Sequence, residues 1–502
     1  MLKQLLPDDL STLPADGSAD LALKLKANLN SEVEKFLADK EFVFELVRGF
    51  GSPLNILLPD LLQDNVHAFQ KILKSYFLSG KIFFAHKTNR SDSILKRLSL
   101  EDVGIDVASA AELKHALACG FAAERIEATG PKNAEFLALA LSHNIVINID
   151  SIVELEEIIR LKEKYNYSSR TQILLRLSDF GNNSRYSNKT SRFGICSWEI
   201  DDALNLILQS KKINLLGLAF HLDTVSLLEK AAAIEVCLEI FERAIAIGLQ
   251  PSILNIGGGF KLNYLAYQSD WDAYTTALRE AVLGHRRPIT WQNNSFGLKA
   301  EKNALRGGLN IYSYYDSLTG AQFLEALLKQ NLPNRNNAQI GNFLRDNGIQ
   351  LWLEPGRSLV NQVGLTVGRV ISIRKSSQGE NLVCLEMKRQ DLCFLDQEFF
   401  VDPIILYKNP GNIDLVSPMA VYFAGNLCLE SDVIYRHQTF VDKLPQTGDL
   451  VVFPNTAGYF MDFSASESIM QPVASKVTVY KDNGRFIWAR DENYLPWSVG
   501  GF

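Results

Sequence analysis

The sequence predicts an α/β protein in which a (β/α)8 TIM-like barrel is followed by a C-terminal antiparallel β-domain. Three observations predict this fold class. The chain has 502 residues, more than one hydrophobic core usually holds, which indicates two or three domains. Between residues 81 and 354 short apolar runs alternate with stretches of helical periodicity, the pattern of βα units. After Arg357 the apolar runs continue without long helices between them, which is typical of antiparallel strands.

Eight apolar runs are the candidate barrel strands. In chain order they are KIFFA (81–85), GIDVA (104–108), RIEAT (125–129), IVINI (145–149), QILLRL (172–177), LLGLAF (215–220), ILNI (253–256) and QLWLE (350–354). Helical stretches between them include residues 110–119, 153–165 and 227–247. Gly120 and Gly248 follow two of these stretches, where glycine favours the conformation that ends a helix. Barrels of this kind carry their functional residues at the carboxyl ends of the strands.

The remaining segments give the expected domain boundaries. Residues 51–365 are expected to form the barrel, with a helix at 271–283 after the seventh strand and an insertion at about 286–345 that contains a second helix. Residues 366–502 are expected to form the β-domain, from the runs LTVGRVISIR, NLVCLEM, MAVYFAG, DLVVFP, KVTVY and RFIWAR. Residues 1–50 form an N-terminal extension with an amphipathic helix, followed by EFVFELVRGFG, which could add a strand to the β-domain.

Composition excludes several classes of protein. Hydrophobic residues make up 47% of the chain and the net charge is −6, with one short basic cluster at 285–287, so we expect no nucleic-acid partner. We expect no membrane span, because there is no run of 18 apolar residues, and no signal peptide at the start. The six cysteines form no CxxC pair, which indicates neither a disulfide framework nor a zinc site. These features predict a cytoplasmic protein without a bound metal.

Several polar residues follow the predicted barrel strands directly. Lys87 follows the first strand, and a lysine there is a solvated group unless burial lowers its pKa from about 10.4 and makes it a nucleophile. His221 follows the sixth strand and is either a packing residue or a flat ring on which a planar ligand stacks. The glycines 257–259 follow the seventh strand, where barrels often bind phosphate. In EPGR (354–357), Gly356 and Arg357 are candidates for the same phosphate, and the Glu354 carboxylate for a ring nitrogen.

Together with other motifs, these residues resemble the fold-type III pyridoxal-phosphate-dependent enzymes. The resemblance is to their decarboxylase branch, which includes the ornithine and diaminopimelate decarboxylases and shares its barrel with alanine racemase. The motifs, in the order of that family, are FFAHKTN, GIDVASAAEL, RIEATGPKN, LLRL, SRFGI, GLAFHLDT, LNIGGGF, EPGR, GNLCLESD and FPNTAGYF. They span residues 51–480 apart from the insertion.

The resemblance implies a role for each matching residue. Lys87 would form the Schiff base with pyridoxal 5'-phosphate, and Glu354 would face the pyridinium nitrogen. Around the cofactor ring would lie Ala85, Asp106, Arg176 and His221, the last stacked on its face. The phosphate would be bound by Thr224, Gly257, Gly258, Gly259, Gly356, Arg357 and Tyr459.

The resemblance also implies a homodimer with active sites shared between subunits. Cys428 would protonate the product in trans, since an ordinary thiol with a pKa of about 8.5 is mostly protonated at neutral pH. Glu430 and Asp432, on the same segment, would contact the substrate. Taken singly, a cysteine is more often a buried structural residue than a proton donor.

Two departures from the family pattern bear on substrate and activity. Asp223 stands where the family has glycine near the phosphate, and Leu429 stands where diamine-forming members carry an acid. We therefore expect decarboxylation of an amino acid or amino-acid-containing intermediate, free or bound to a carrier, with an apolar, acidic or tethered tail. The alternatives are a racemase, although Glu354 replaces the arginine that racemases of this fold place at the ring nitrogen, and a non-catalytic homologue that binds a partner.

Overall fold

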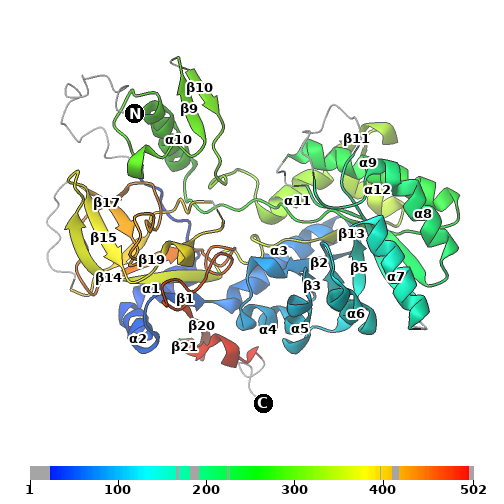
Figure 1. The fold of residues 1–502 in the computed structure, drawn as a ribbon, viewed down its shortest axis with the longest axis horizontal. Coiled ribbons are helices and arrows are strands. Elements are labelled where there is room, and N and C mark those ends of the chain that lie inside the picture. Colours follow the sequence, from blue (N-terminus) through cyan, green and yellow to red (C-terminus); the bar gives the residue numbers. More distant parts are fainter. Residues whose placement is uncertain are drawn as a thin grey trace.

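The computed structural model describes residues 23–496, except for 166–168, 181–190, 223, 225, 303, 396 and 410–417. The described chain forms two lobes, which lie side by side in Figure 1. A closed barrel ringed by helices is at the right and a β-domain at the left. The predicted fold class is therefore confirmed. Asp223, whose effect on phosphate binding was in question, lies outside the described residues.

Eight parallel strands close the barrel, and each coincides with one of the predicted runs. Around the barrel they follow the order β13, β2, β3, β4, β5, β6, β7, β8. Their bounds are β2 (Gly80–Ala85), β3 (Gly104–Val107), β4 (Ile126–Ala128), β5 (Val146–Ile149), β6 (Thr171–Leu177), β7 (Ile213–Phe220), β8 (Ile253–Asn255) and β13 (Gln350–Leu353). Five of these strands contribute one side chain each to a separate buried cluster of Phe83, Leu174, Ala219, Ile253 and Trp352. The barrel is thus packed with side chains, as expected for this fold.

Helices surround the barrel and cover its apolar outer face. They are α3 (Leu62–Ser75), α4 (Asp92–Ser99), α5 (Ala110–Ala118), α6 (Ala134–Ser142), α7 (Ile152–Lys164), α8 (Ile200–Gln209), α9 (Leu227–Ala246), α11 (Gly320–Leu328) and α12 (Ile340–Asp346). The three predicted helices at 110–119, 153–165 and 227–247 correspond to α5, α7 and α9. Gly120 and Gly248 adopt φ values of 96° and 97° after α5 and α9, which confirms the expected glycine helix ends.

The β-domain is built on one nine-stranded sheet. Its strands are β1 (Leu54–Leu57), β14 (Gly364–Lys375), β15 (Asn381–Leu385), β16 (Ile404–Leu406), β17 (Met419–Ala424), β18 (Thr439–Val441), β19 (Leu450–Pro454), β20 (Ser475–Asp482) and β21 (Arg485–Arg490). Most pairs are antiparallel, but β1 pairs with β20 and β15 with β17 in parallel. The expectation of a purely antiparallel sheet is therefore corrected to a mixed sheet. Long connections before β17 and β20 allow these parallel pairs.

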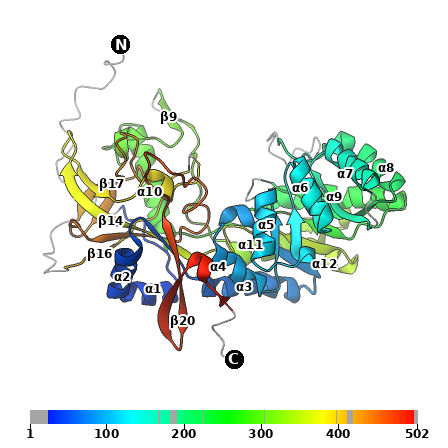
Figure 2. The same cartoon turned by 60° about the horizontal axis from the view of Figure 1, so that its bottom comes forward.

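The N-terminal segment differs from the prediction. EFVFELVRGFG was a candidate strand, but it lies almost entirely in helix α2 (Lys40–Phe50), which follows α1 (Ser31–Ala38). Val43, Leu46 and Val47 are the buried residues of α2, and their spacing is that of one helical face. The strand that this part of the chain adds to the β-domain is β1, a few residues later. Figure 2 shows α1 and α2 next to β20, where the rings of Phe36 and Phe486 approach to 5.6 Å.

Between β8 and β13 the chain leaves the barrel, crosses to the β-domain and returns. We call residues 262–319 the excursion, because the hydrogen bond from Gly320 N to Lys261 O, 2.8 Å long, joins its two ends. It contains α10 (Gln268–Val282), β9 (Leu298–Glu301) and β10 (Ala304–Gly307), which lie over the β-domain in Figure 1. The helix predicted at 271–283 thus exists but covers the β-domain instead of the barrel, with the ring of Tyr274 5.5 Å from that of Phe400.

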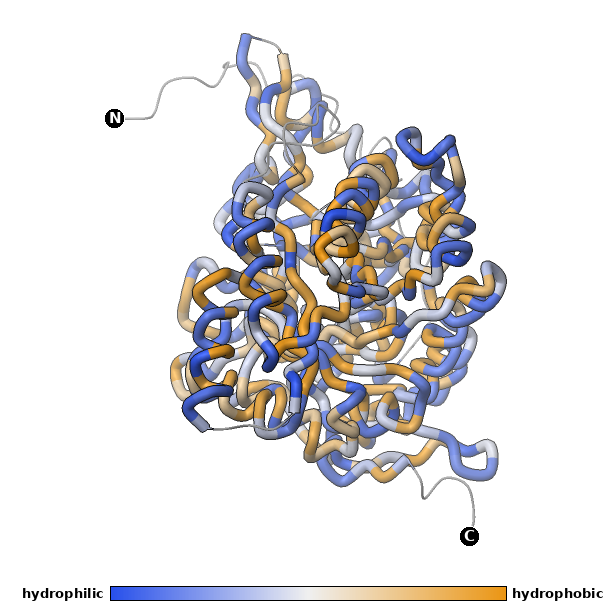
Figure 3. The backbone as a smooth tube through the Cα atoms, turned by 90° about the vertical axis from the view of Figure 1, so that its right-hand side faces the viewer, coloured by the Kyte–Doolittle hydropathy of each residue, from blue (hydrophilic) through white to orange (hydrophobic). Residues whose placement is uncertain are grey.

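The arrangement of hydropathy follows this two-lobed fold. Hydrophobic segments run mainly through the interior and hydrophilic ones mainly along the outside (Figure 3). Among the described residues no helix is both long and apolar enough to cross a membrane.

Candidate active site

A cavity of about 1020 Å³ opens at the carboxyl ends of the barrel strands. It is lined by most of the residues that the sequence placed around a cofactor: Ala85, Lys87, His221, Thr224, Gly258, Gly259, Glu354, Gly356, Arg357 and Tyr459. These residues come from four barrel strands or the loops after them, and from the β-domain. Parallel strands bring their carboxyl ends to one rim, which is why residues far apart in sequence meet here.

Lys87 lies in the short turn that follows β2, and its side chain is exposed to the cavity. Burial lowers the pKa of its amine, but the acidic groups of Tyr459, Asp106 and Glu354 outweigh this effect, and the pKa lies above its usual value. The net lowering of the pKa expected for a nucleophilic lysine is therefore not found in this arrangement of charges. The positive charge of the Lys87 ammonium thus acts as the counter-ion of these acidic side chains.

Three carboxyl groups form that acidic centre, and the sequence identified only two of them. Burial raises the pKa of Glu354, Asp106 and Glu127, that of Asp106 to about 7, and the Glu354 carboxylate raises the pKa of Asp106 and Glu127 further. Asn255 joins them, since its Nδ2 donates to Glu354 Oε1 at 2.7 Å and to both oxygens of Glu127 at 3.0 Å. Glu127 is fully buried inside the barrel. The run RIEAT already indicated Glu127, because an acidic side chain in the middle of a barrel strand is buried away from solvent.

The Asp106 carboxylate also accepts a hydrogen bond of 2.5 Å from Thr129 Oγ1. Arg176 Nη1 lies 3.2 Å from Asp150, and its guanidinium is 4.7 Å from the ring centre of Phe193. Asp106 and Arg176 do not line the cavity, although their charges act on Lys87. Their assignment to the cofactor ring stays a prediction.

His221 lines the cavity as a neutral imidazole. Its Nδ1 accepts a hydrogen bond from Gly258 N at 3.2 Å, so the proton of the neutral ring is on Nε2. Burial, followed by the charges of Lys87 and Lys230, lowers its pKa well below the usual value. A neutral, flat ring that faces a cavity favours stacking on a planar ligand over simple packing.

The glycine loop after β8 has the geometry of an anion site. Gly257 and Gly259 have φ values of 64° and 84°, which favour glycine, and a Cβ at Gly258 would lie 2.6 Å from Glu354 O. Gly257 N donates to Asn255 Oδ1, and Gly258 N to His221. Gly259 is exposed to the cavity, and its N–H has no acceptor among the described residues. The unshared N–H of Gly259 at this turn suits a phosphate oxygen.

The EPGR turn completes the opposite wall. A Cβ on Gly356 would lie 2.2 Å from Thr88 Oγ1 and 3.1 Å from the Tyr459 hydroxyl, so only glycine fits between them. Arg357 is buried and donates to the Tyr264 hydroxyl at 2.8 Å, while the ring centre of Tyr312 is 4.5 Å from its guanidinium. Both tyrosines belong to the excursion, whose involvement the sequence did not reveal. The unshared N–H groups of Arg357 and Gly259 could bind a phosphate that lies between these two walls.

The outer wall of the cavity is largely apolar. Its large apolar side chains are Leu309, Ile311, Tyr312, Phe394, Leu395 and Phe463. The first three come from the excursion and the others from the β-domain. Glu229 and Glu354 are the acids among the described lining residues.

Cys428, Glu430 and Asp432 lie elsewhere in the chain. Cys428 and Glu430 are exposed, and Glu430 and Asp432 border a separate cavity of about 380 Å³ beside Trp291 of the excursion. None of the three is among the described residues that line the Lys87 cavity. The Asp432 carboxylate is buried and accepts from Leu427 N and Arg389 N, each at 2.8 Å. Asp432 therefore braces the loop that presents Cys428, and its expected contact with the substrate stays a prediction.

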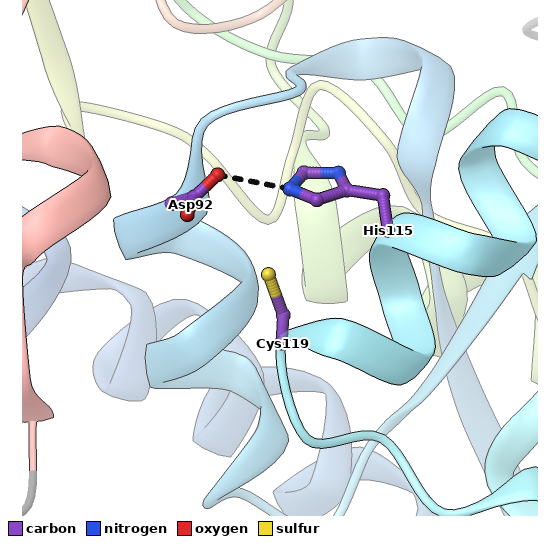
Figure 4. Close-up of side chains that lie close together, drawn as sticks. All are labelled: Asp92, His115 and Cys119. Carbon is purple, nitrogen blue, oxygen red and sulfur yellow. Dashed lines mark hydrogen bonds and ion pairs between the residues drawn. The ribbon is translucent and has the colours of Figure 1, made fainter.

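A further group of titratable side chains lies between α4 and α5 (Figure 4). Asp92, His115 and Cys119 place potential ligand atoms within 4.8 Å of one another. His115 Nε2 lies 3.0 Å from Asp92 Oδ1, and hydrogen bonds to Asp92 and Cys119 raise the pKa of His115 to about 9. Lys96 pairs with the same carboxylate at 3.2 Å. Two cations of the chain thus already neutralise Asp92.

Comparison with known proteins agrees with this geometry. Residues 61–301 match the family described as pyridoxal-dependent decarboxylase, pyridoxal binding domain. Uncharacterized protein y4yA of Sinorhizobium fredii is 28% identical over 91% of this chain and 93% of its own length. The 2-[(L-alanin-3-ylcarbamoyl)methyl]-2-hydroxybutanedioate decarboxylase of Staphylococcus aureus is 28% identical over 86% of this chain and 95% of its own.

A solved structure shares the whole fold. The diaminopimelate decarboxylase from M. jannaschii, in complex with L-lysine, superposes with a TM-score of 0.65 at 19% identity, over 91% of this chain and 95% of that chain. The resemblance that the motifs indicated is thus confirmed by a family profile, by relatives and by fold. Residues 61–301 therefore belong to the pyridoxal-binding domain of the pyridoxal-dependent decarboxylases.

Proposed function

We propose that this protein removes the α-carboxylate of an amino acid that carries a bulky tail, and that it works as a homodimer. The observation that carries the proposal is the single cavity in which Lys87, the Gly259 N–H and Glu354 meet. The Lys87 amine suits the aldehyde of pyridoxal phosphate, the Gly259 N–H suits its phosphate, and the Glu354 carboxyl group suits its ring nitrogen. When bound, this cofactor withdraws electrons from the α-carbon of the substrate so that CO₂ can leave.

The chain's own groups hold and orient the reacting parts. Lys87 Nζ would hold the aldehyde of the cofactor. Glu354 would face its ring nitrogen, and the orientation of this carboxyl group is fixed by the 2.7 Å hydrogen bond from Asn255. The neutral His221 ring would limit movement of the cofactor. Gly259 N and Arg357 would bind its phosphate.

The proton that replaces CO₂ is assigned to Cys428 of a second subunit. The bond between the α-carbon and the carboxylate breaks, CO₂ leaves, and the Cys428 thiol donates its proton to the same carbon before regaining one from solvent. In the single chain Cys428 is exposed and away from its own cavity. A symmetric dimer, in which each subunit presents this loop to its partner, would bring the thiol to the reacting carbon.

The lining of the cavity supports a substrate tail that is not a simple amine. Its outer wall carries large apolar side chains, among them Ile311, Tyr312 and Phe394, and Leu429 stands where a distal ammonium would need an acid. The relative from Staphylococcus aureus acts, by its name, on an alanine unit joined through a carbamoyl group to a hydroxybutanedioate. An amino acid extended through its side chain would likewise need the large cavity found here.

The test is a screen for CO₂ release and for change of optical rotation. The purified protein with pyridoxal phosphate would be given free amino acids, diamino acids, and amino acids extended through the side chain by an amide. CO₂ release from the extended compounds is the expected result. Inversion of the α-carbon without CO₂ would instead show a racemase, and binding of the cofactor with neither reaction would favour a non-catalytic homologue.

A further inference from the structure

Lys230, on helix α9, is a buried lysine that the reaction described above does not use. Its side chain is fully buried. Its ammonium donates a hydrogen bond of 2.7 Å to Gly258 O, lies 3.5 Å from Ile256 O, and is 5.8 Å from the ring centre of Phe260. All these partners are neutral. Among the residues that the structure describes, no carboxylate oxygen lies within 4 Å of Lys230 Nζ.

Two other lysines with buried ammonium groups have different partners. Lys132 Nζ is 2.8 Å from Glu154, and Lys388 Nζ is 3.2 Å from Asp391. Each of these two ammonium groups thus has a carboxylate partner, which offsets much of the cost of removing a charge from water. For a buried ammonium whose only partners are carbonyl oxygens, most of the free-energy cost of removing the charge from water is not offset. Lys230 therefore destabilises the fold unless an anion comes close to it.

The position of Lys230 indicates which anion that is. Its Nζ lies 3.5 Å from where a Cβ of Gly259 would be, directly behind the glycine loop. The peptide between Gly258 and Gly259 is planar, so its C=O and N–H point in opposite directions. Because the C=O is held by Lys230, the N–H of Gly259 points away from the ammonium. That N–H has no acceptor among the described residues, and Gly259 is exposed to the cavity.

We propose that Lys230 is a positioning residue for the cofactor phosphate, which it attracts by its charge and through the Gly258–Gly259 peptide that it orients. The inference rests on the proposed binding of the phosphate at this loop. Burial lowers the pKa of Lys230 to about 8, although the charge of Glu354 acts in the opposite direction. A phosphate dianion on the far side of the loop would supply the missing charge at a short distance.

The test compares two ligands that differ only in the phosphate. Apoprotein with Lys230→Met, and the unchanged protein, would be titrated with pyridoxal 5'-phosphate and with pyridoxal, and followed by the absorbance of the bound ligand. We expect the dissociation constant for pyridoxal phosphate to rise roughly 10- to 100-fold, the effect of losing a charged hydrogen-bonding partner. That for pyridoxal should change by less than about twofold. Thermal unfolding of the apoprotein should shift upward in Lys230→Met, because the unpaired charge is gone.

Two further variants separate this role from a merely structural one. Lys230→Arg keeps the charge and should restore most of the preference for the phosphorylated ligand, even if Lys230→Met folds poorly. Lys132→Met removes a buried lysine that has a carboxylate partner, and it should lower the unfolding temperature while leaving that preference unchanged.

Some outcomes would overturn the inference. An equal loss of affinity for both ligands in Lys230→Met would do so, as would a preference unchanged in both Lys230 variants or a less stable Lys230→Met apoprotein. A protein that releases no CO₂ from any substrate, yet loses its phosphate preference with Lys230→Met, would leave this inference standing and refute only the proposed reaction.

Discussion

The barrel rim and the loop that carries Cys428 both hold residues expected in the active site, but only the rim assembles them within one chain. At the rim, Lys87, His221 and Glu354 line one cavity. In the loop, Cys428 and Glu430 are exposed, beside a smaller cavity bordered by the excursion. The difference agrees with the proposal that one subunit binds the cofactor while Cys428 of a second subunit supplies the proton.

The two regions also differ in what holds them. The rim residues follow barrel strands, and the hydrogen bonds between these strands fix the position of each loop. The polar side chains of the rim also contact one another. The Cys428 loop is held by one buried carboxylate, Asp432, through the backbone N–H groups of Leu427 and Arg389. A loop that carries its own internal brace can present a side chain outward, which is what a shared active site requires.

The largest expected effect is that of Lys87→Ala. Removing the amine that binds the cofactor should lower CO₂ release at least about a thousandfold and abolish the visible absorbance of covalently held cofactor. Lys81→Ala is the matched control, because Lys81 lies at the start of the same strand, at the opposite end of the barrel. CO₂ release by Lys87→Ala at an undiminished rate would remove the rim from the reaction altogether.

Mixing two inactive variants tests whether the two regions belong to different subunits of one site. In a homodimer of Lys87→Ala, both active sites lack the lysine. In a homodimer of Cys428→Ala, both lack the cysteine. After exchange of subunits, half of the dimers are mixed, and each of these has one intact site, so activity should return to about a quarter of the unchanged protein. A monomer in solution at every concentration tested, or no recovery in a mixture shown to exchange, would contradict the shared site.

The sequence was sufficient for the barrel because its signals are local. Each strand is a short apolar run, and Lys87 and Glu354 could be placed because the residue after a barrel strand always reaches the same rim. The cradle glycines were found for the same reason. Helix α2 was misread because its apolar residues Phe42, Val43 and Phe44 are consecutive, and such a run does not distinguish a strand from a buried helix.

Residues whose role depends on packing between distant segments could not be found in this way. Tyr312 reaches Arg357 only because the excursion returns past the cavity on its way from the β-domain to the barrel. Lys230 looks like an ordinary helical lysine until the helix is placed against the glycine loop. Glu127 and Asn255 become partners only because barrel closure places β4 and β8 opposite each other across the interior.

Glu127 offers a smaller but sharper test of the rim. Burial raises its pKa well above the usual value, which favours the neutral acid. Glu127→Gln should then change the free energy of unfolding by less than about 1 kcal/mol, since an amide replaces a neutral acid of the same shape. Glu127→Ala should cost roughly 2 to 4 kcal/mol, because it leaves a cavity and unpaired Asn255 and Asn148 side chains. Urea unfolding would measure both, and an equal loss in both variants would indicate a charged Glu127.

The smallest expected effect concerns Asp402, the β-domain counterpart of the buried acids at the rim. Burial raises its pKa to about 7, although Oδ2 accepts from Leu25 N at 2.7 Å. An acid whose pKa is higher in the folded than in the unfolded chain stabilises the fold at low pH, and this stability is lost as pH rises towards 7. The unchanged protein should therefore lose roughly 1 to 3 kcal/mol between pH 5 and 8 relative to Asp402→Asn, because asparagine keeps the hydrogen bond and never ionises.

Urea unfolding of the apoprotein at both pH values measures this difference. Asp442→Asn is the control, since its side chain is 72% exposed and its removal should leave the pH dependence as it is. Parallel pH dependence of Asp402→Asn and the unchanged protein would mean that Asp402 is as well solvated when folded as when unfolded. Buried carboxyls of the β-domain would then differ from those at the rim, where Asp106 is kept near the same pKa by Glu354 as well as by burial.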